Sequence, residues 1–290
     1  MKIGPLATKL LQSLDEPLPG AGAGPMLREF DWQAHGVTHP YVIFMTGRCG
    51  STWLTTVLKN TGLAGHPMEY FNGDVARRER EFSKATGLAD YFSGAVRRDA
   101  TGGRFGVEID AVRMQQVEPF VDWGAVLPPD RIAAFFLHRR DILAQAWSWV
   151  AAKKTGIWHL RANRNFVQEP KDTSLPTDAE LAREIVRIRE GEEYLEAFFA
   201  RIGYTPFYLD YELLMAELTT EVATILRLLG FDEERIAAAP VAEVGATRKM
   251  QYSDRQLVLS QFNHRHRDAM AQLRRDRFGM SSAELARALA

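Results

Sequence analysis

One segment, residues 41–72, constrains the fold of this 290-residue chain more than any other. A continuous apolar run, Tyr41–Met45, predicts a buried strand. A short turn with two glycines follows, and a helix is expected to begin at Ser51. A strand, a glycine turn and a helix in this order favour the binding of an anion, because backbone N–H groups and the helix N-terminus point toward the turn. The segment therefore predicts a phosphate or sulfate site, to which Arg48 adds a full positive charge.

The glycine turn matches neither of two well-known nucleotide fingerprints. A Walker A loop has four residues between its glycines and then Gly-Lys-Ser/Thr, whereas only two residues separate Gly47 from Gly50 here. The dinucleotide pattern G-x-G-x-x-G is absent as well. An ordinary ATPase or GTPase is therefore disfavoured. The alternative to an anion site is a strand–turn–helix corner whose glycines serve backbone geometry alone.

Two separated blocks of residues resemble the Stf0 family of bacterial sulfotransferases. The first block reads Arg48-x-Gly50-Ser51-Thr52, then Thr61-Gly62-x-Ala64-Gly65-x-Pro67-x-Glu69-Tyr70-Phe71. The second block reads His138-Arg139-Arg140-Asp141-x-x-x-Gln145-Ala146-x-Ser148-Trp149, then Thr155-Gly156-x-Trp158. Both occur in the family's order, and the resemblance covers about residues 40–260, whereas residues 1–38 have no obvious counterpart.

The resemblance implies how a nucleotide would be bound. The known type of the family transfers a sulfuryl group from phosphoadenosine phosphosulfate (PAPS) to trehalose. The residues implied for the 5′-phosphosulfate end are Arg48, Cys49, Gly50, Ser51 and Thr52. Ser51 could instead cap the helix, or do both. Arg139 and Ser148 are implied to bind the 3′-phosphate, for which a forked guanidinium is well suited.

Several of these basic residues also have a plainer interpretation. A surface ion pair with Asp141 is the alternative for Arg139, and we favour it for Arg140. Arg248 and Lys249 are a further nucleotide-binding candidate, since other sulfotransferases carry a similar C-terminal pair, but a solvated basic pair explains them equally well.

The resemblance also implies the catalytic and acceptor-binding residues. Glu69, between apolar and aromatic neighbours, aligns with the family's general base, which takes the proton of the acceptor hydroxyl. Arg48 would stabilise the leaving phosphate. Glu108 stands where family members commonly carry Lys, and could bind acceptor hydroxyls, act as a second base or pair with a local Arg. Trp158 and His159 could contact the acceptor, although Trp158 could equally pack in the core.

Bulk properties exclude several other classes of function. A net charge of −1 gives no general surface for nucleic acid, and a single cysteine allows no intramolecular disulfide. No window approaches about 18 uninterrupted apolar residues, and the N-terminus lacks a signal-peptide core. The seven histidines form no metal-binding array, so no metal is expected. We expect a soluble cytoplasmic protein without stable membrane insertion.

The order of predicted elements indicates the fold class. Strands are expected at 41–45, 104–109, 131–137 and 206–209. Helices are expected at 51–60, 74–99, behind Asp141, 178–199, 212–229, 257–275 and 282–289, with a long loop at 156–177. This alternation predicts an α/β, P-loop-like three-layer fold with a central parallel sheet flanked by helices. We expect a partly flexible N-terminal extension over residues 1–38 and one sulfotransferase-like domain over residues 39–290.

Together these features favour a PAPS-dependent O-sulfotransferase acting on a carbohydrate, a glycolipid or another alcohol. An ATP-dependent phosphotransferase of P-loop type is one alternative, and it would require Mg²⁺. A nucleotide-binding protein that has lost transfer, through Glu108 in place of the family's Lys, is the other. The family resemblance further implies a possible homodimer.

Overall fold

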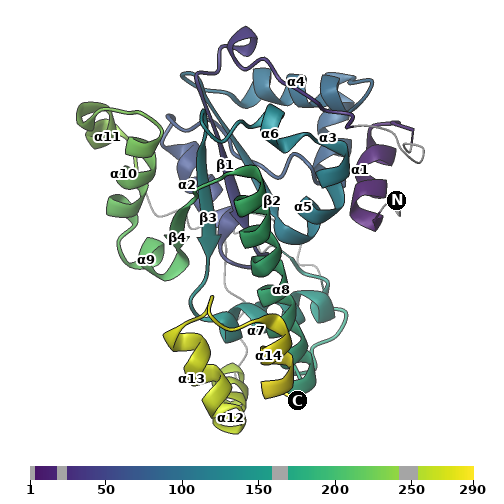
Figure 1. Cartoon of the computed structure of the whole chain (residues 1–290), viewed down its shortest axis with the longest axis vertical. Coiled ribbons are helices and arrows are strands. Elements are labelled where there is room, and N and C mark those ends of the chain that lie inside the picture. The colour runs from purple at the N-terminus through teal and green to yellow at the C-terminus, as the bar shows by residue number, and fades with distance from the viewer. Residues whose placement is uncertain (1–3, 18–24, 159–168, 242–253) are drawn as a thin grey trace.

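The computed structural model of the chain describes residues 4–17, 25–158, 169–241 and 254–290. Its four strands form one sheet in the order β2-β1-β3-β4, and all three strand pairs are parallel (Figure 1). The strands are β1 (His39–Met45), β2 (Arg104–Asp110), β3 (Ala133–His138) and β4 (Phe207–Asp210). The prediction of an α/β fold with a central parallel sheet is confirmed.

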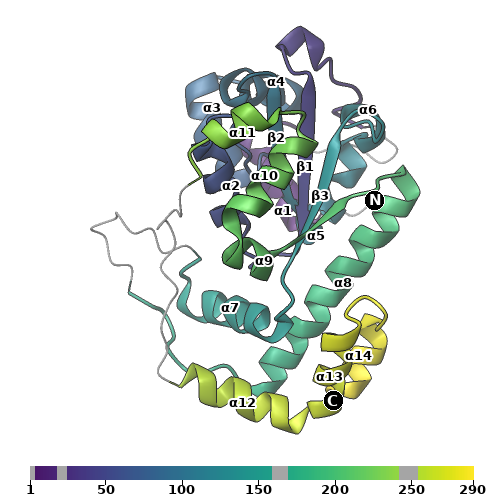
Figure 2. The same ribbon diagram turned by 90° about the vertical axis from the view of Figure 1, so that its left-hand side faces the viewer.

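Helices cover both faces of this sheet (Figures 1 and 2). One face carries α2 (Ser51–Asn60), α9 (Tyr211–Ala216), α10 (Leu218–Leu228) and α11 (Glu233–Ala238). The other carries α1 (Pro5–Ser13), α3 (Gly73–Ser83), α4 (Leu88–Asp99), α5 (Ala111–Val117), α6 (Trp123–Val126) and part of α8 (Asp178–Ile202), with short 3₁₀ helices at Gln33–His35 and Glu118–Phe120.

The strand sequences explain why both faces are covered. Successive side chains of a strand point to opposite faces, and every residue of β1 after His39 is buried. Tyr41 and Ile43 pack with α2 and α10, while Val42 and Phe44 pack in the core on the other face. A strand that is apolar at every position therefore fits only the interior of a three-layer fold.

A third group of helices lies beyond the carboxyl ends of the strands (Figure 2). It comprises α7 (Ile142–Thr155), α12 (Arg255–Arg265), α13 (Arg267–Arg275) and α14 (Ser282–Ala288) around the first half of α8. The 25 residues of α8 connect both parts, since Leu181 packs in this group and Phe198 in the sheet core. The carboxyl ends of the strands therefore face the junction between the sheet and this helical group.

Three predicted helices are each interrupted, so the prediction of single helices was wrong there. The 74–99 region divides into α3 and α4, because Lys84 adopts a left-handed φ of 54° and ends α3. The 212–229 region breaks at Glu217, which is not helical, and the 257–275 region breaks at His266. Apolar periodicity continues across such short breaks, and the sequence therefore does not reveal them.

The N-terminal residues contribute to the main core. Leu10, Leu11 and Leu14 are buried together with Val42 and Phe44 of β1. The predicted division at residue 38 stays a prediction, and residues 1–3 and 18–24 of the predicted extension lie outside the described residues. No helix within the described residues combines the length and apolar character needed to cross a membrane.

Candidate active site

The glycine turn between β1 and α2 has an unusual backbone. Arg48 and Gly50 adopt left-handed φ angles of 67° and 93°, a conformation that costs a non-glycine residue about 1–2 kcal/mol. A Cβ on Gly50 would lie 2.4 Å from the ring of Tyr211, so only glycine fits there. Gly50 is the N-cap and Ser51 the first residue of α2, and no side chain caps this end. The alternative of Ser51 as a helix cap was therefore wrong.

A buried glutamine of α7 holds the turn through hydrogen bonds. Gln145 is fully buried, and its Nε2 donates to the carbonyl oxygen of Thr46 at 3.3 Å, the Thr46 hydroxyl at 3.0 Å and the Gly47 carbonyl oxygen at 2.9 Å. Its Oε1 accepts from Arg277 Nη2 at 3.3 Å. Arg277 in turn pairs with the fully buried Glu192 of α8 at 2.5 Å. The C-terminal region thus fixes the amide that holds the turn.

Arg48 joins the two sequence blocks that carried the resemblance. Its Nε donates to Ser148 Oγ on α7 at 3.0 Å, and its Nη1 donates to the carbonyl oxygen of Trp158 at 2.6 Å. Burial lowers the pKa of Arg48 from its usual value, and the nearby charge of Arg139 lowers it further. Two arginines from the ends of different strands therefore approach each other beside the start of α2.

Arg139 follows β3 and stacks over the aromatic ring that covers the turn. Its guanidinium carbon lies 4.9 Å from the ring centroid of Tyr211. Its Nε is buried without a hydrogen-bond partner, and the Glu212 carboxylate oxygen lies 3.7 Å from it. A buried guanidinium donor that no protein atom satisfies is a feature expected of an anion site. The family resemblance implied that Ser148 binds the 3′-phosphate together with Arg139. The Ser148 hydroxyl instead accepts a hydrogen bond from Arg48, whereas Arg139 stacks on Tyr211.

Glu69 lies across the start of α2 from the two arginines, and its side chain contacts polar groups. Its Oε2 accepts hydrogen bonds from Asn72 Nδ2 and from Arg113 Nη1, both at 2.8 Å, and its side chain is 25% exposed. The expectation of apolar surroundings was wrong, because the aromatic neighbours Tyr70 and Phe71 turn into the core instead. The carboxylate is therefore reachable by solvent and held in one orientation.

Glu108 on β2 lies close to Glu69 and is almost completely buried, with 4% exposed. The backbone N–H of Glu108 donates to the carbonyl oxygen of Met68 at 2.9 Å, which places the Glu69 segment alongside β2. Burial, and then the charge of Glu69, raise the pKa of Glu108 to about 8. Pairing with a local Arg was one predicted role, but none of the ion pairs among the described residues includes Glu108.

Comparisons with known proteins agree with this geometry. The model of the family described as Stf0 sulphotransferase matches residues 40–103 and 130–256, which is more than half of the chain. The chain belongs to the Stf0 sulphotransferase family. It is 27% identical over 248 residues to the trehalose 2-sulfotransferase of Mycobacterium tuberculosis, covering 72% of this chain and 91% of that protein. It is likewise 27% identical over 252 residues to the enzyme of that name from Mycolicibacterium smegmatis, covering 73% of this chain and 92% of that protein.

The other residues predicted for the site are partly buried, partly exposed and partly outside the described residues. Cys49 is fully buried, and burial raises its pKa to about 12, so its thiol is not a reactive group. Thr52 is exposed on the first turn of α2. Trp158 is 42% exposed, which excludes a core position, and its ring packs edge-on against that of Trp149, with centroids 5.5 Å apart. His159, Arg248 and Lys249 lie outside the described residues.

Other residues of the site were not predicted from the sequence. Gln145 was part of the quoted second block but received no role. Tyr211 directly follows β4, and the carboxyl end of a parallel strand is where ligand contacts gather. Arg113 and Arg277 carry no signal in the sequence that separates them from other arginines. Arg140, expected on Asp141, instead pairs with Asp210 at 2.7 Å.

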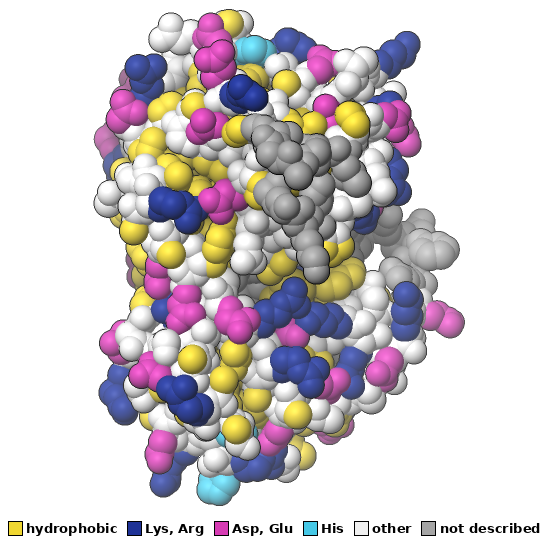
Figure 3. Space-filling view, turned by 45° about the vertical axis from the view of Figure 1, so that its right-hand side comes forward, with side chains coloured by type: hydrophobic (Ala, Val, Ile, Leu, Met, Phe, Trp, Pro, Cys, Tyr) yellow, Lys and Arg dark blue, Asp and Glu magenta, His cyan; other side chains and the backbone are white. Residues whose placement is uncertain are grey.

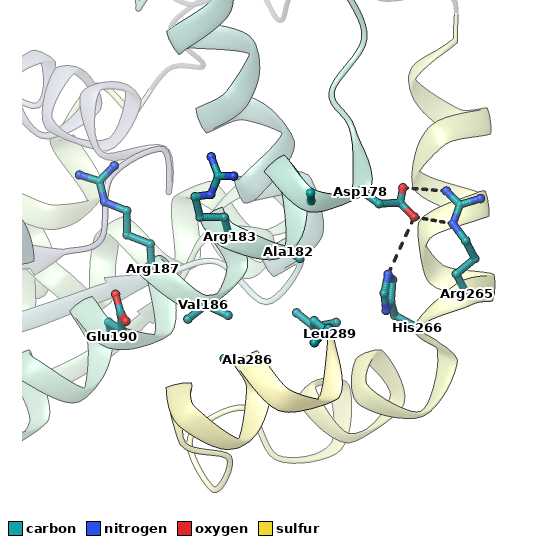
Figure 4. Close-up of a pocket in the computed structure, with 12 residues that line it drawn as sticks. Asp178, Ala182, Arg183, Val186, Arg187, Glu190, Arg265, His266, Ala286 and Leu289 are labelled. Atoms are coloured by element: carbon teal, nitrogen blue, oxygen red, sulfur yellow. Dashed lines mark hydrogen bonds and ion pairs between the residues drawn. The ribbon is translucent and has the colours of Figure 1, made fainter.

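Two hollows lie near α8, which runs past this Stf0 site. A small one of about 20 Å³ adjoins the turn and is lined by Gly47, Trp149 and Arg187 among others. A larger one of about 830 Å³ lies between α8, the end of α12 and α14 (Figure 4). There Asp178 pairs with Arg265 and His266, and the pocket contains none of the residues that carried the resemblance. The site at the turn is therefore separate from the larger hollow.

On the face shown in Figure 3, acidic and basic side chains are interspersed, with some basic side chains gathered at the waist of the molecule. The described residues include no group of three or more His, Cys, Asp or Glu arranged to hold a metal ion.

Proposed function

We propose that this protein transfers a sulfuryl group from PAPS to a hydroxyl of a carbohydrate or glycolipid, with Glu69 as the general base. The observation that carries the proposal is the placement of opposite charges around one helix start. Arg48 and Arg139 approach α2 from the ends of β1 and β3, and Glu69 lies on the β2 side. A sulfuryl transfer needs cations for an anionic leaving group and a carboxylate for the attacking hydroxyl.

The residues at the turn fit the donor. The left-handed turn and the N-terminus of α2 direct N–H groups to one point, as an anion requires. The unsatisfied Nε of Arg139 and the adjacent Arg48 supply charge-assisted donors for phosphate oxygens. Bound PAPS would supply an activated sulfuryl group whose leaving group is phosphoadenosine phosphate (PAP). We assign the 5′ end to Arg48, Gly50, Ser51 and Thr52, and the 3′-phosphate to Arg139, with Arg248 and Lys249 as further candidates.

Glu69 is the residue that would remove the acceptor's proton. Arg113 and Asn72 both donate to Oε2 of Glu69, which orients the carboxylate and leaves Oε1 for the acceptor hydroxyl. As the acceptor oxygen forms its bond to sulfur, the bond from sulfur to the phosphate oxygen breaks and the hydroxyl proton passes to Glu69. Arg48 stabilises the charge that develops on the leaving phosphate.

A sugar is the acceptor class we favour. The two relatives are named as trehalose 2-sulfotransferases, so trehalose is the first compound to test. Trp158 is bound through its carbonyl oxygen to Arg48 and keeps its indole exposed, an arrangement that suits stacking on a sugar ring. Glu108 and His159 are further acceptor-side candidates, and the homodimer implied by the family resemblance stays a prediction.

Calorimetric titration of PAP against ADP, without added metal, tests the donor assignment. Selective binding of PAP would support a site that recognises the 3′-phosphate. Turnover of PAPS with a panel of sugars, trehalose first, would then test the acceptor. A preference for ADP that requires Mg²⁺ would contradict the sulfotransferase assignment and favour phosphoryl transfer.

A further inference from the structure

Glu184 of α8 has a buried carboxylate oxygen that no described residue satisfies. The residue is 5% exposed, and Lys153 of α7 donates to its Oε1, which supplies the positive charge that a buried carboxylate needs. Its Oε2 is buried without a hydrogen-bond partner among the described residues, and Arg187 Nη1 lies 3.7 Å from it, beyond hydrogen-bond distance. Because buried polar atoms nearly always have a partner, this open acceptor indicates that a donor from outside the chain binds there.

The small hollow beside the turn gives such a donor room to reach Glu184, which forms part of its lining. Asp110, Val112 and Trp149 in the same lining are partly exposed, so the hollow leads from the surface toward the buried carboxylate. Its volume of about 20 Å³ exceeds the roughly 10–15 Å³ that one water-sized group needs. The hollow therefore admits a single hydroxyl group rather than a whole sugar ring.

Two glycines bring the walls of this hollow together. A Cβ on Gly47 would lie 2.5 Å from the ring of Trp149, so a side chain there would displace the indole. A Cβ on Gly191 of α8 would lie 3.1 Å from Ala111 Cβ and 3.2 Å from Thr46 Cγ2. Close packing of α7, α8 and the turn therefore fixes the size of the hollow.

The hollow adjoins both the proposed base and the proposed donor site. Asp110 in its wall pairs with Arg113, and the same Nη1 of Arg113 donates to Glu69 at 2.8 Å. Gly47 in its wall belongs to the turn that is assigned to the donor. An acceptor whose reacting hydroxyl meets Glu69 would therefore carry a neighbouring hydroxyl toward Glu184.

We propose that Glu184 binds a second hydroxyl of the acceptor, not the one that is sulfated, and thereby selects sugars over alcohols with a single hydroxyl. The inference rests on the proposed function, because it takes Glu69 to be the base that meets the reacting hydroxyl. A carboxylate oxygen only accepts hydrogen bonds, so Oε2 suits a hydroxyl donor. A simple alcohol leaves Oε2 unpaired, and a site built around a hydrogen bond discriminates against substrates that lack it.

Acceptors that lack one hydroxyl test this assignment. The probes are the sugar with the fastest turnover of PAPS, trehalose being tried first, and its analogues that each lack one hydroxyl. With the unaltered protein, one analogue that keeps the sulfated position should lose about 10–150-fold in kcat/KM, the range for a hydrogen bond to a charged group. With Glu184→Ala, the complete sugar should lose the same factor, that analogue should lose nothing further, and PAP affinity should not change.

Two further variants separate this role from a structural one. Glu190→Ala, at an exposed position of the same helix, is the matched control and should keep the preference for the complete sugar. Glu184→Gln keeps the shape of the side chain and an oxygen for Lys153, so it should fold normally and still lose part of that preference with the charge.

The contrary outcomes are distinct from one another. An unchanged rate for Glu184→Ala, or the same loss with every analogue, would mean that Glu184 only holds a water molecule or the fold. Binding of PAP without turnover of any sugar would overturn this inference and leave the donor assignment standing. Absence of PAP binding would overturn the proposed function and this inference together.

Discussion

Two sides of the same helix start differ in how they are built. The arginine side consists of Arg48, Arg139 and Ser148, and the carboxylate side consists of Glu69 and Glu108. Arg139 directly follows β3, and Arg48 and Ser148 contact each other across the junction of β1 and α7. On the carboxylate side, two acids that carry like charges are brought together by an extra chain segment that runs parallel to β2.

The difference shows which parts of a site a fold supplies and which need particular side chains. Any parallel sheet directs strand ends and helix N-termini toward one edge, so the arginine side follows from the architecture. Bringing two carboxylates together is unfavourable and needs compensating groups. Here Arg113 and Asn72 hold Glu69, and burial raises the pKa of Glu108 above its usual value.

The largest effect is expected on the carboxylate side. Replacing Glu69 with Gln keeps the contact with Arg113 but removes the base, so kcat should fall about 10²–10⁴-fold. PAP affinity should change little, since the arginine side is intact. Steady-state rates and calorimetry on the same preparation measure both quantities, with Glu81→Gln as the control. An unchanged rate would remove Glu69 from the mechanism.

The next effect concerns the support of the arginine side. Arg277→Met leaves Glu192 short of a partner and the Oε1 of Gln145 without its donor. Breaking a buried ion pair of this kind should lower the free energy of unfolding by about 3–5 kcal/mol. Denaturant titration measures the change, and Arg275→Met, at an exposed position, should leave it near zero. Equal stability of the two variants would show that the buried pair does not stabilise the fold.

A smaller effect is expected within the arginine side. Arg139→Ala should weaken PAP binding about 10–100-fold, the range for a lost charge-assisted hydrogen bond, and should weaken ADP binding much less. The neighbouring Arg140 is the control, since it is exposed and pairs with Asp210. Calorimetry with both nucleotides gives the ratio. The same loss for PAP and ADP would mean that Arg139 does not recognise the 3′-phosphate.

The smallest effect is expected from Ser148→Ala. It removes one of the two hydrogen bonds that orient Arg48, while the bond to the Trp158 carbonyl oxygen remains. A neutral hydrogen bond contributes about 0.5–1.5 kcal/mol, which corresponds to about a 2- to 13-fold loss of PAP affinity. Ser260→Ala, on the exposed side of α12, is the reference. A loss as large as that of Arg139→Ala would show that Ser148 contacts the nucleotide itself.

The pH dependence of stability provides a further comparison of the two acids. Because the pKa of Glu108 is raised to about 8, its protonated form favours the folded state. The stabilisation of the folded state by protonated Glu108 is fully present below the unfolded pKa of about 4.3 and is lost as pH rises through 8. The unaltered protein should therefore lose more unfolding free energy between pH 5 and 9 than Glu108→Gln does. Parallel curves from denaturant titrations would contradict a neutral Glu108.

The sequence predicted the arginine side better than the carboxylate side, for a physical reason. The strand at 41–45 and the helix at 51–60 are local patterns, and both were confirmed, so the turn between them could be placed from its own residues. The contact between Glu69 and Glu108 depends on a register across 39 residues of chain, which no local pattern encodes. The break at His266 and the role of Arg277 were missed for the same reason, because both depend on packing against α8.

The dependence of the turn on Arg277 also sets an order of events during synthesis. Residues 45–50 leave the ribosome early, but the amide of Gln145 that holds them lacks its donor until residue 277 is available. Until then Glu192 lacks one of its two arginine partners. A nascent chain therefore carries every residue of the anion site well before it can fix their geometry. The ability to bind a nucleotide should appear abruptly, once residue 277 has left the ribosome, rather than grow with chain length.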